Sequence, residues 1–512
     1  MGQKTISIKL PTDYSDDDIH RLLRRELGFA KFTFHISNKS LDARNKQNIH
    51  WLTSIIVLSD ELPATNSETD PELQIPFAKR NKKILIVGSG PAGFFSAYAL
   101  QLAGFETSLI ERGSEVNKRE KAIHAFESGR SFDPANNYAF GEGGAGTFSD
   151  GKLTSRSKHI SPERKFILSS YIKAGGPAEI AFLAHPHLGT DNLKIIVQNL
   201  RKMYADVGGK ILFDTKLEDL IIHPGKAFSV KTSRGDMDAD AVFIAPGHSA
   251  FETYRMLMKR GVIFRTKGFA LGSRMEHPQE LINEAQWGKK SLPGVKAAEY
   301  RLTSDADGKH PVYSFCMCPG GMVVPATAYA EMNIVNGMSH YLRNGAFANA
   351  ACVAGIHPDA LAGRKVSPLE ALDILEKLES EFFRRTKHYA APACSIADFL
   401  SRKLKNHSLS SSYPLGLSVL PLWELLPAEI IPSLKVGLSD FNRRIRGFEK
   451  GILLGLESKT SSSIQVLREA DGETSGIQNL YLVGEGSGYA GGIISSAADG
   501  LKAAMNFIRK SG

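Results

Sequence analysis

The sequence predicts an α/β protein with more than one domain, and three observations support this fold class. The chain has 512 residues, which is too long for one ordinary hydrophobic core. Residues 82–111 have the pattern of a buried strand, a glycine-rich turn, a helix and a second strand. Another apolar strand, residues 479–483, comes much later and again leads into glycines. A parallel sheet assembled from distant segments accounts for both patterns.

Composition and charge favour an ordinary globular protein. Hydrophobic residues make up 42% and charged residues 23% of the chain, which is close to globular averages. The formal net charge is +9, but Lys and Arg are mixed with acidic residues, so we do not expect nucleic acid as a partner. The four cysteines are too few for a disulfide framework and show no metal-ligand spacing, so we expect no metal. Without an apolar leader or an apolar stretch of spanning length, we expect a cytoplasmic protein with no membrane span.

Residues 1–60 predict a small N-terminal α+β module. An extended segment is followed by a helix that begins after the acidic residues 16–18, because carboxylates favour a helix N-terminus. Residues 31–36 and 53–58 then predict two more strands. This order of strand, helix, strand and strand favours a ferredoxin-like arrangement. The polar, proline-containing residues 61–81 predict a linker.

The glycines of residues 88–93 predict a dinucleotide site. Gly88 permits a tight turn, Gly90 lets a pyrophosphate approach the backbone, and Gly93 allows the helix to lie close to the strand. The helix N-terminus then presents unpaired N–H groups to phosphates. Glu111 ends the second strand, where a carboxylate accepts hydrogen bonds from ribose hydroxyls. The cofactor-binding residues predicted in this unit are Gly88, Gly90, Pro91, Ala92, Gly93, Glu111 and Arg112.

The C-terminal segment indicates FAD as the dinucleotide. The strand at residues 479–483 ends in Gly484 and Glu485. This resembles flavoproteins of the glutathione-reductase and hydroxybenzoate-hydroxylase classes, which place a Gly-Asp pair after such a strand, and the resemblance implies that Glu485 binds the ribityl chain. Glycines through Gly491 and Gly492 leave room for a flat ligand. The helix from Ile493 directs its positive end at that ligand.

A third segment completes the predicted domain. Residues 239–247 resemble the strand and turn, ending at Gly247, with which such flavoproteins re-enter the FAD domain. We therefore expect a discontinuous Rossmann-like FAD-binding domain formed by residues 82–265 and 455–512. Residues 266–454 would then be an inserted α+β domain that contacts substrate. No second glycine fingerprint follows a strand, so we expect no separate NAD(P)H domain, although NAD(P)H can still bind transiently over the flavin.

A glycine-rich loop and the lysine that follows it are further candidates. Five glycines lie between residues 141 and 151, a composition suited to wrapping backbone amides around a cofactor or anion. A tight structural loop is the alternative. Lys152 would stabilise negative charge on a reduced flavin or bind an acidic substrate. The cofactor-binding residues predicted here are Gly143, Gly144, Gly146 and Thr147.

Cys316 and Cys318 form a CxC sequence in the inserted domain. One interpretation is a redox dithiol that exchanges electrons with FAD. The other is that both are small buried packing residues, since a CxC disulfide closes a strained ring. His185 and His187 have the same two alternatives, proton donors or packing residues. Residues 274–277 contain Arg, Glu and His and follow an extended apolar segment. One interpretation is that these side chains project into a cleft; the other, which we expect, is ion pairs at a domain surface.

Several longer segments have a distinctive sequence, namely residues 39–44, 137–153, 185–191, 316–321 and 484–492. Together they resemble the uncharacterised FAD-dependent dehydrogenase family, also labelled NAD(FAD)-utilising dehydrogenases, over nearly the whole chain. The resemblance implies FAD and an oxidoreductase activity, but names neither a substrate nor an oligomeric state.

These observations favour a FAD-dependent oxidoreductase that transfers a hydride or an electron pair to or from a small-molecule substrate. A flavin monooxygenase is a near alternative, but its usual second fingerprint has no clear match. A flavin-dependent RNA-modifying or RNA-binding protein would explain the positive charge and the N-terminal module. A non-catalytic FAD-bound scaffold would bind FAD without turnover.

Overall fold

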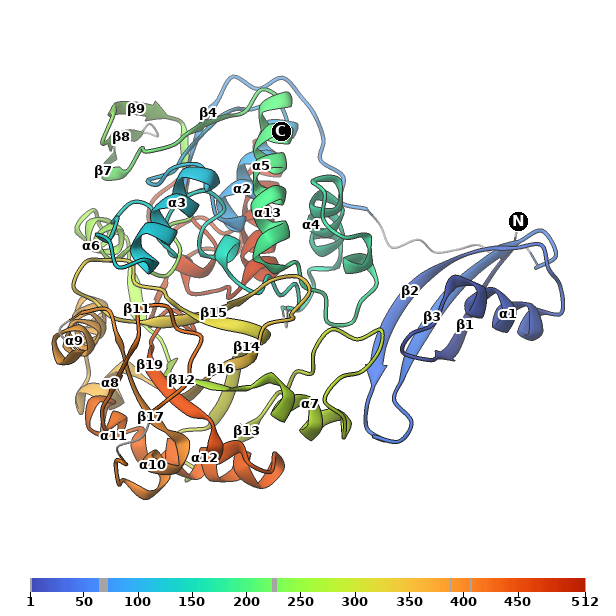
Figure 1. The fold of residues 1–512 in the computed structure, drawn as a ribbon. Helices are drawn as coiled ribbons and strands as arrows, with labels where there is room; N and C mark the ends of the chain where they lie inside the picture. The colour runs from blue at the N-terminus through green and yellow to red at the C-terminus, as the bar shows by residue number, and fades with distance from the viewer. Residues whose placement is uncertain are drawn as a thin grey trace.

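The computed structural model describes residues 2–63, 72–155, 157–222, 228–386, 388–405 and 408–511. Residues 64–71 of the predicted linker lie outside these ranges. The described chain has a small N-terminal sheet and a larger body that contains a parallel sheet and a mainly antiparallel sheet (Figure 1). The fold is therefore mixed α/β, as the sequence predicts.

The N-terminal sheet stands to one side of the body in Figure 1 and contains β1 (Gly2–Leu10), β2 (Thr33–Asp42) and β3 (His50–Ser59). Helix α1 (Asp16–Leu27) begins where the Ser15 side chain accepts a hydrogen bond from the backbone N–H of Asp18, and the Asp18 carboxylate accepts one from the backbone N–H of Ser15. The strand order is β1-β3-β2 with antiparallel neighbours. This is the order of the first half of a ferredoxin-like unit. Its second helix and fourth strand do not follow within the described residues, so the ferredoxin-like expectation holds only for that half.

The parallel sheet has the strand order β21-β10-β4-β5-β6, and every neighbouring pair in it is parallel. Its strands come from distant parts of the chain: β4 (Lys83–Val87), β5 (Glu106–Ile110), β6 (Lys210–Leu212), β10 (Ala241–Ile244) and β21 (Leu480–Leu482). The residues of β10 and β21 are all buried, because helices and loops cover both faces of the sheet. Helix α2 (Pro91–Leu102) contacts α13 (Ile493–Lys510) along its length. The two helices and the sheet enclose one hydrophobic core.

The antiparallel sheet has the order β13-β14-β16-β12-β19-β17-β18, with β15 paired to β14. Only β17 and β18 pair in parallel. Helices α7, α9, α10 and α12 cover it and share a second large core with it. The bounds are β12 (Phe269–Pro278), β13 (Thr303–Ser304), β14 (Val312–Pro325), β15 (Val335–Ser339), β16 (Phe347–Ile356), β17 (Ala391–Ser395), β18 (Leu417–Val419), β19 (Ile452–Glu457), α7 (Gln279–Trp287), α9 (Pro368–Thr386), α10 (Ile396–Ser401) and α12 (Ile431–Arg444).

Smaller elements connect these layers. A sheet of three strands, β7-β8-β9, and the pair β11-β20 lie beside the parallel sheet. Within the described ranges, no helix is long and apolar enough to cross a membrane. The remaining bounds are α3 (Val116–Glu127), α4 (Ser161–Lys173), α5 (Gly189–Asp206), α6 (Phe251–Lys259), α8 (Pro358–Ala362), α11 (Leu422–Leu425), β7 (Leu217–Ile222), β8 (Phe228–Thr232), β9 (Gly235–Ala239), β11 (Phe264–Thr266) and β20 (Ile464–Val466).

Candidate functional site

A large open cleft lies at the carboxyl ends of the parallel strands. Its lining includes the residues that directly follow β4, β5, β10 and β21 and, from the antiparallel sheet, Phe315, Cys316 and Asn336. The space between its walls is about 1500 Å³, with the solvent at its mouth included. Ligands of open α/β sheets bind at this edge, and the space exceeds what one small ligand needs. The cleft therefore has room for a dinucleotide and a substrate.

Two helix N-termini point into this cleft. Helix α2 begins after Gly90 and α13 begins after Gly492, and neither N-terminus has a side-chain cap or an acidic residue in its first turn. Both N-terminal residues line the cleft. The unpaired backbone N–H groups and the positive end of each helix dipole therefore remain available to a ligand. An anionic or electron-rich ligand such as a pyrophosphate is the chemistry that suits them.

The glycines of the first turn have different roles. A Cβ on Gly93 would lie 1.9 Å from the carbonyl oxygen of Gly88, so Gly93 holds α2 against the turn and does not face the cleft. Gly88 has a φ of +97°, and a Cβ added to it would lie 2.3 Å from the carbonyl oxygen of Ala245. By contrast, Gly247 and Gly492 have positive φ and nothing within 4 Å of an added Cβ. Their open sides leave the space that a flat cofactor requires.

Glu111 lies at the end of β5 and is almost completely buried. Its carboxylate accepts hydrogen bonds from the backbone N–H and hydroxyl of Ser89, at 2.9 and 2.8 Å, and from the N–H groups of Gly113 and Gly141. Glu111 therefore joins the first glycine turn to the later glycine-rich loop. It also lines the cleft, so a ribose hydroxyl that enters would meet an oriented carboxylate.

Arg112 follows Glu111 and also lines the cleft. Its guanidinium lies 3.8 Å from the centre of the Phe140 ring and forms an ion pair of 2.6 Å with Glu252. The Nε atom of Arg112 is buried and has no hydrogen-bond partner among the described residues. A buried donor without a partner is unusual in a folded protein. This donor beside the Glu111 carboxylate therefore fits the polar part of a bound cofactor.

The glycine-rich loop is held by one buried arginine that the sequence did not reveal. Arg119 lies on α3 and is fully buried. Its guanidinium donates to five backbone carbonyls of the loop and of the residues just before it, at 2.8 to 3.3 Å, and among the described residues no carboxylate forms an ion pair with it. Burial lowers its pKa to about 10, so it stays charged near neutral pH. The five accepting carbonyls belong to Asn137, Tyr138, Gly141, Glu142 and Gly144.

Lys152 belongs to a charged cluster at the wall of the cleft. Its Nζ atom donates to Asp150 at 2.9 Å and to the carbonyl of Met317. Asp150 also accepts two hydrogen bonds from Arg343, at 2.7 and 3.1 Å. Burial opposes the charge of Lys152, but Asp150, Cys318 and Cys316 outweigh it and hold the pKa of Lys152 above its ordinary value. Lys152 is therefore a fixed positive charge and not a proton acceptor.

Cys316 and Cys318 occupy different environments. Cys316 lines the cleft, whereas Cys318 is fully buried behind it. The Sγ atom of Cys318 donates to the carbonyl of Cys316 at 3.3 Å. Arg274 donates to the same carbonyl at 2.7 Å and lies 3.5 Å from the Cys318 sulfur. Cys318 is thus buried beside the carbonyl of Cys316, and Cys316 is accessible from the cleft.

Arg274 corrects the expectation of a surface ion pair. Arg274, Glu276 and His277 are all buried in the antiparallel sheet. Arg274 pairs with Glu457 at 2.9 Å in the sheet interior, and His277 contacts the carbonyl of Phe448 at 2.9 Å. The expectation failed because charged residues are usually exposed unless a partner is buried with them. That partner lies far away in the sequence.

Glu485 follows β21 and lines the cleft with Gly484. Its pKa is raised to about 7, chiefly by burial and also by the nearby charge of Cys316, while a hydrogen bond from the N–H of Gly492 and the charge of Lys267 oppose the rise. The Gly-Glu pair, the start of α13 and the CxC sequence therefore share one region of the cleft. A carboxyl group that titrates near neutral pH is typical of functional sites.

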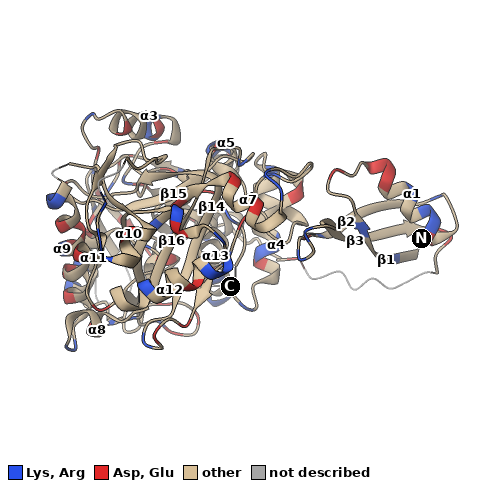
Figure 2. Ribbon diagram, turned by 60° about the horizontal axis from the view of Figure 1, so that its bottom comes forward, with Lys and Arg blue, Asp and Glu red and all other residues tan. Residues whose placement is uncertain are grey.

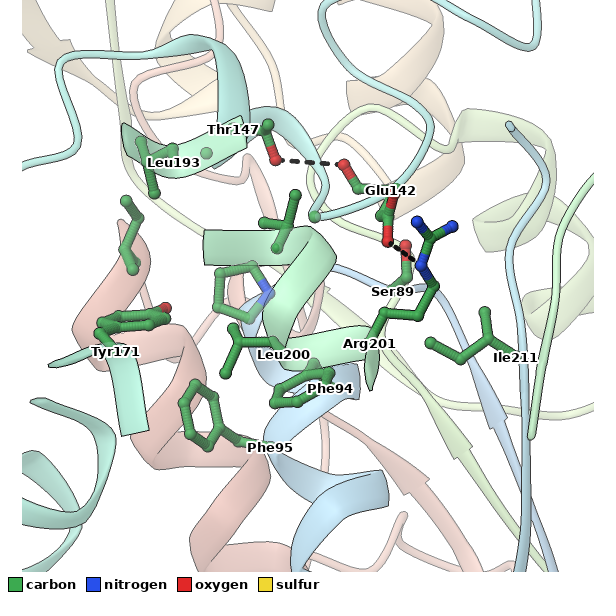
Figure 3. Close-up of a pocket in the computed structure, with 15 residues that line it drawn as sticks. Ser89, Phe94, Phe95, Glu142, Thr147, Tyr171, Leu193, Leu200, Arg201 and Ile211 are labelled. Atoms are coloured by element: carbon green, nitrogen blue, oxygen red, sulfur yellow. Dashed lines mark hydrogen bonds and ion pairs between the residues drawn. The ribbon is translucent and has the colours of Figure 1, made fainter. Parts of the chain in front are cut away.

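Two of the remaining predicted residues line a second pocket. Gly143 and Thr147 contribute to a mainly apolar pocket, which shares Pro91, Gly146 and Ile493 with the cleft. In Figure 3 an ion pair of 3.3 Å between Glu142 and Arg201 lies at its edge, and Thr147 donates to the carbonyl of Glu142 at 3.1 Å. The other side chains labelled there are Ser89, Phe94, Phe95, Tyr171, Leu193, Leu200 and Ile211.

Most of the predicted site residues therefore lie around one cleft. Gly93, Gly491 and Cys318 are not among its lining residues, since Gly93 packs inside, Cys318 lies behind Cys316, and Gly491 is exposed. The predicted residues that line the cleft are Gly88, Gly90, Pro91, Ala92, Glu111, Arg112, Gly144, Gly146, Lys152, Gly247, Cys316, Gly484, Glu485, Gly492 and Ile493.

His185 and His187, which the sequence singled out, are not among the residues that line the cleft. His187 is buried, and its Nε2 atom contacts the carbonyl of Tyr341 at 3.0 Å. Burial lowers its pKa to about 4. His185 is exposed, 3.8 Å from Glu299. His248, which the sequence analysis missed, lines the cleft and contacts the hydroxyl of Ser249 at 2.7 Å.

Comparison with known proteins finds one matching family model and one relative that aligns with nearly the whole chain. Residues 268–460 match the family described as FAD-dependent protein, C-terminal domain-like. This range contains all strands of the antiparallel sheet. An uncharacterized protein of Clostridium beijerinckii is 37% identical to this chain, over 97% of each.

Solved structures resemble the chain more distantly. A flavoprotein/dehydrogenase from Cytophaga hutchinsonii has 11% identity and a TM-score of 0.36, over 84% of this chain and 79% of that one. A glycine oxidase from Bacillus cereus has 12% identity and a TM-score of 0.34, over 84% and 96% of the two chains. Likeness at this level does not identify a reaction.

Proposed function

The chain belongs to the same family as its Clostridium beijerinckii relative, and its residues 268–460 match a domain of FAD-dependent proteins; on this premise we propose that it is a FAD-dependent oxidoreductase. The observation that carries the proposal is the cleft itself, where two uncapped helix N-termini and the Glu111 carboxylate surround an open space. In the proposed reaction an electron pair or a hydride passes between FAD and a small substrate.

The residues of the cleft fit FAD in three respects. The N-terminus of α2, after Gly90, offers N–H donors to the pyrophosphate. Glu111 and the unpartnered Nε of Arg112 offer an acceptor and a donor to the adenosine ribose side. The N-terminus of α13 and the open side of Gly492 offer a positive dipole and room for the flavin ring.

The chain would contribute binding, orientation and charge, while bound FAD would supply the acceptor and donor of the electron pair. Arg119 keeps the glycine-rich loop in one conformation through its five backbone acceptors. Lys152, held by Asp150, places a fixed positive charge at the cleft wall, where it stabilises developing negative charge. The Glu485 carboxyl, with a pKa of about 7, can hold or release a proton near neutral pH.

The proposal also includes a reductant and a cellular compartment. NAD(P)H would reach the flavin from the open side of the cleft as a transient co-substrate. We keep the cytoplasm as the proposed compartment and a small molecule as the proposed substrate. Nucleic acid is not the proposed partner, since Figure 2 shows Lys and Arg mixed with Asp and Glu over the described chain.

The experiment that tests the proposal is a visible absorption spectrum of the purified protein after incubation with FAD and removal of unbound FAD. We expect flavin bands, which bleach anaerobically when NADH or NADPH is added. Bands that persist with either nucleotide would point to another electron donor. A protein that retains no FAD would contradict the proposal, and FAD without turnover with any donor would favour a scaffold.

A further inference from the structure

We propose that Cys316 and Cys318 form a redox-active dithiol that exchanges an electron pair with the flavin site, with Cys316 as the reactive thiol and Cys318 as its resolving partner. This rests on the proposed function and adds a second redox group to the same cleft. The geometry that points to it is a distorted strand that presents one thiol to the cleft and keeps the other directly behind it.

Strand β14 is irregular at the CxC sequence. Its pairing with β16 shifts between Phe315 and Cys318 and again between Cys318 and Gly321. Cys316 has a φ of +45°, which is the left-handed region that side chains other than glycine rarely adopt. Such bulges redirect side chains near active sites, and strained backbone is retained where the surrounding structure enforces it. The distortion leaves Cys316 at the wall of the cleft.

The surrounding structure that enforces this conformation is a buried cation. Arg274 donates to the carbonyl of Cys316 at 2.7 Å, to Asn349 at 2.9 Å and to Asn336 at 3.0 Å, and it pairs with Glu457 at 2.9 Å. A buried arginine with this many partners fixes the backbone it contacts. The turn at Cys316 is therefore built into the sheet interior.

The two thiols are two residues apart on the distorted strand, influence each other through a side-chain hydrogen bond, and differ in ionisation. The hydrogen bond from Cys318, together with the positive charges of Lys152 and Arg274, lowers the pKa of Cys316 against the effect of burial. The same hydrogen bond and burial raise the pKa of Cys318. One thiolate beside one thiol is the arrangement from which a disulfide forms and reopens.

The proposed step balances within the site. Oxidation of the pair forms one S–S bond, removes the remaining Cys318 proton, and releases two electrons. FAD is the two-electron acceptor named in the proposed function, and the proton is released into the cleft, which Cys316 and the Glu485 carboxyl both line. In the reverse direction the disulfide takes up two electrons and one proton, which restores the Cys316 thiolate and the Cys318 thiol.

Two other cysteines provide matched controls. Cys352 and Cys394 are fully buried in β16 and β17, and neither lines the cleft. Burial raises the pKa of Cys352 well above its usual value and that of Cys394 to about 12. Their thiols therefore show how reactive a buried cysteine of this protein is when it does not line the cleft.

The first test is alkylation of the folded, reduced full-length protein with iodoacetamide from pH 5 to 9, read by mass spectrometry of each cysteine. We expect Cys316 to react at pH values at least about one unit below the ordinary thiol pKa of about 8.5, whereas Cys352 and Cys394 stay unmodified. If Cys316 reacts only above about pH 8, or no faster than Cys352, the proposal is overturned.

The second test counts electrons by anaerobic dithionite titration of the oxidised, FAD-loaded protein. We expect the wild type and Cys352→Ala to take up two more electrons per flavin than Cys316→Ser or Cys318→Ser, with the 316–318 disulfide found by mass only before reduction. Equal uptake by all variants would overturn the dithiol and leave the flavin function standing. A protein that binds no FAD would overturn both the flavin function and the exchange of electrons with it. The alkylation profile would then show whether the Cys316 thiolate exists in the absence of FAD.

Discussion

Arg343 and Asp150 form a two-point ion pair, at 2.7 and 3.1 Å, although 193 positions separate them in the sequence. Both side chains are almost fully buried. The pair ties the antiparallel sheet to the glycine-rich loop and holds the carboxylate that orients Lys152. This ion pair therefore holds two sides of the cleft, the antiparallel sheet and the glycine-rich loop, in position relative to each other.

Replacing Arg343 by Gln should destabilise the protein by about 3 kcal/mol, because it leaves Asp150 buried with only part of its neutralising charge. Urea unfolding followed by circular dichroism measures this change. Arg364→Gln is the matched control, since Arg364 pairs with Glu370 at 2.7 Å on the exposed surface, where such pairs contribute less than about 1 kcal/mol. Equal losses for the two variants would contradict the structural role of the buried pair.

Gly93→Ala should prevent normal FAD binding. The added Cβ would lie 1.9 Å from the Gly88 carbonyl oxygen, so α2 must move away from the turn that holds the pyrophosphate. We expect a loss of at least about 2 kcal/mol in stability and no retained flavin absorbance. Gly491→Ala is the control for stability, because nothing lies within 4 Å of its added Cβ. Retention of FAD by Gly93→Ala at the wild-type level would refute the assigned packing role.

Arg119→Met should weaken FAD binding through the loop and not through a lost cofactor contact. The substitution removes the donor for five carbonyls, and each buried group left without a partner costs about 1–3 kcal/mol. FAD titration by flavin fluorescence and urea unfolding should both show large losses. Arg130→Met, an exposed position just after the same helix, should change neither. If Arg119→Met is destabilised but binds FAD with normal affinity, the conformation of the glycine-rich loop does not determine FAD binding, and the prediction is wrong.

Glu485 should make stability depend on pH between about 4.5 and 7. Its folded pKa is about 7 because burial, and then the charge of Cys316, raise it from the ordinary value of 4.5. The folded state therefore holds the proton more tightly, and the contribution of Glu485 to stability is present at low pH and lost as the pH rises through 7. In urea unfolding of the FAD-free protein, Glu485→Gln should show a smaller fall over this range. Parallel curves for the two proteins would show that Glu485 titrates normally.

Lys152→Gln should raise the pKa of Cys316. The positive charge of Lys152 is one of the influences that lower it, so its removal should move the alkylation profile of Cys316 to higher pH. The profile is read by mass spectrometry, as for the wild type. Lys158→Gln, an exposed lysine in the same segment, should leave the profile in place. An unchanged profile in Lys152→Gln would mean that Arg274 and Cys318 alone set the ionisation of Cys316.

Local patterns predicted the parts of the site that depend on local backbone. Gly88, Gly90 and Glu111 were found because their roles require fixed spacing within one strand-helix-strand unit, and the structure brings them to one cleft. Glu485 was found because it directly follows a buried strand. In each case the sequence pattern and the residue that it identifies are close together in the sequence.

Interactions between segments that are distant in the sequence could not be predicted, because they produce no local sequence pattern. Arg119 acts on carbonyls, which every residue has, so its acceptors cannot be recognised in the sequence. Arg274 was expected at a surface, and its partner Glu457 lies 183 positions away. The distortion at Cys316 depends on Arg274, so the accessibility of its thiol could not be predicted either.

The position of β21 and α13 has a consequence for the order in which the protein is made. The strands of the antiparallel sheet lie between residues 269 and 457, so that sheet can close while the chain is still being synthesised, since domains fold as units. The parallel sheet lacks its edge strand until residues 480–482 leave the ribosome, and α2 lacks its neighbouring helix until residues 493–510 follow. The wall formed by Val483 to Ile493 therefore appears last, and FAD enters a polypeptide whose other sheet has already folded.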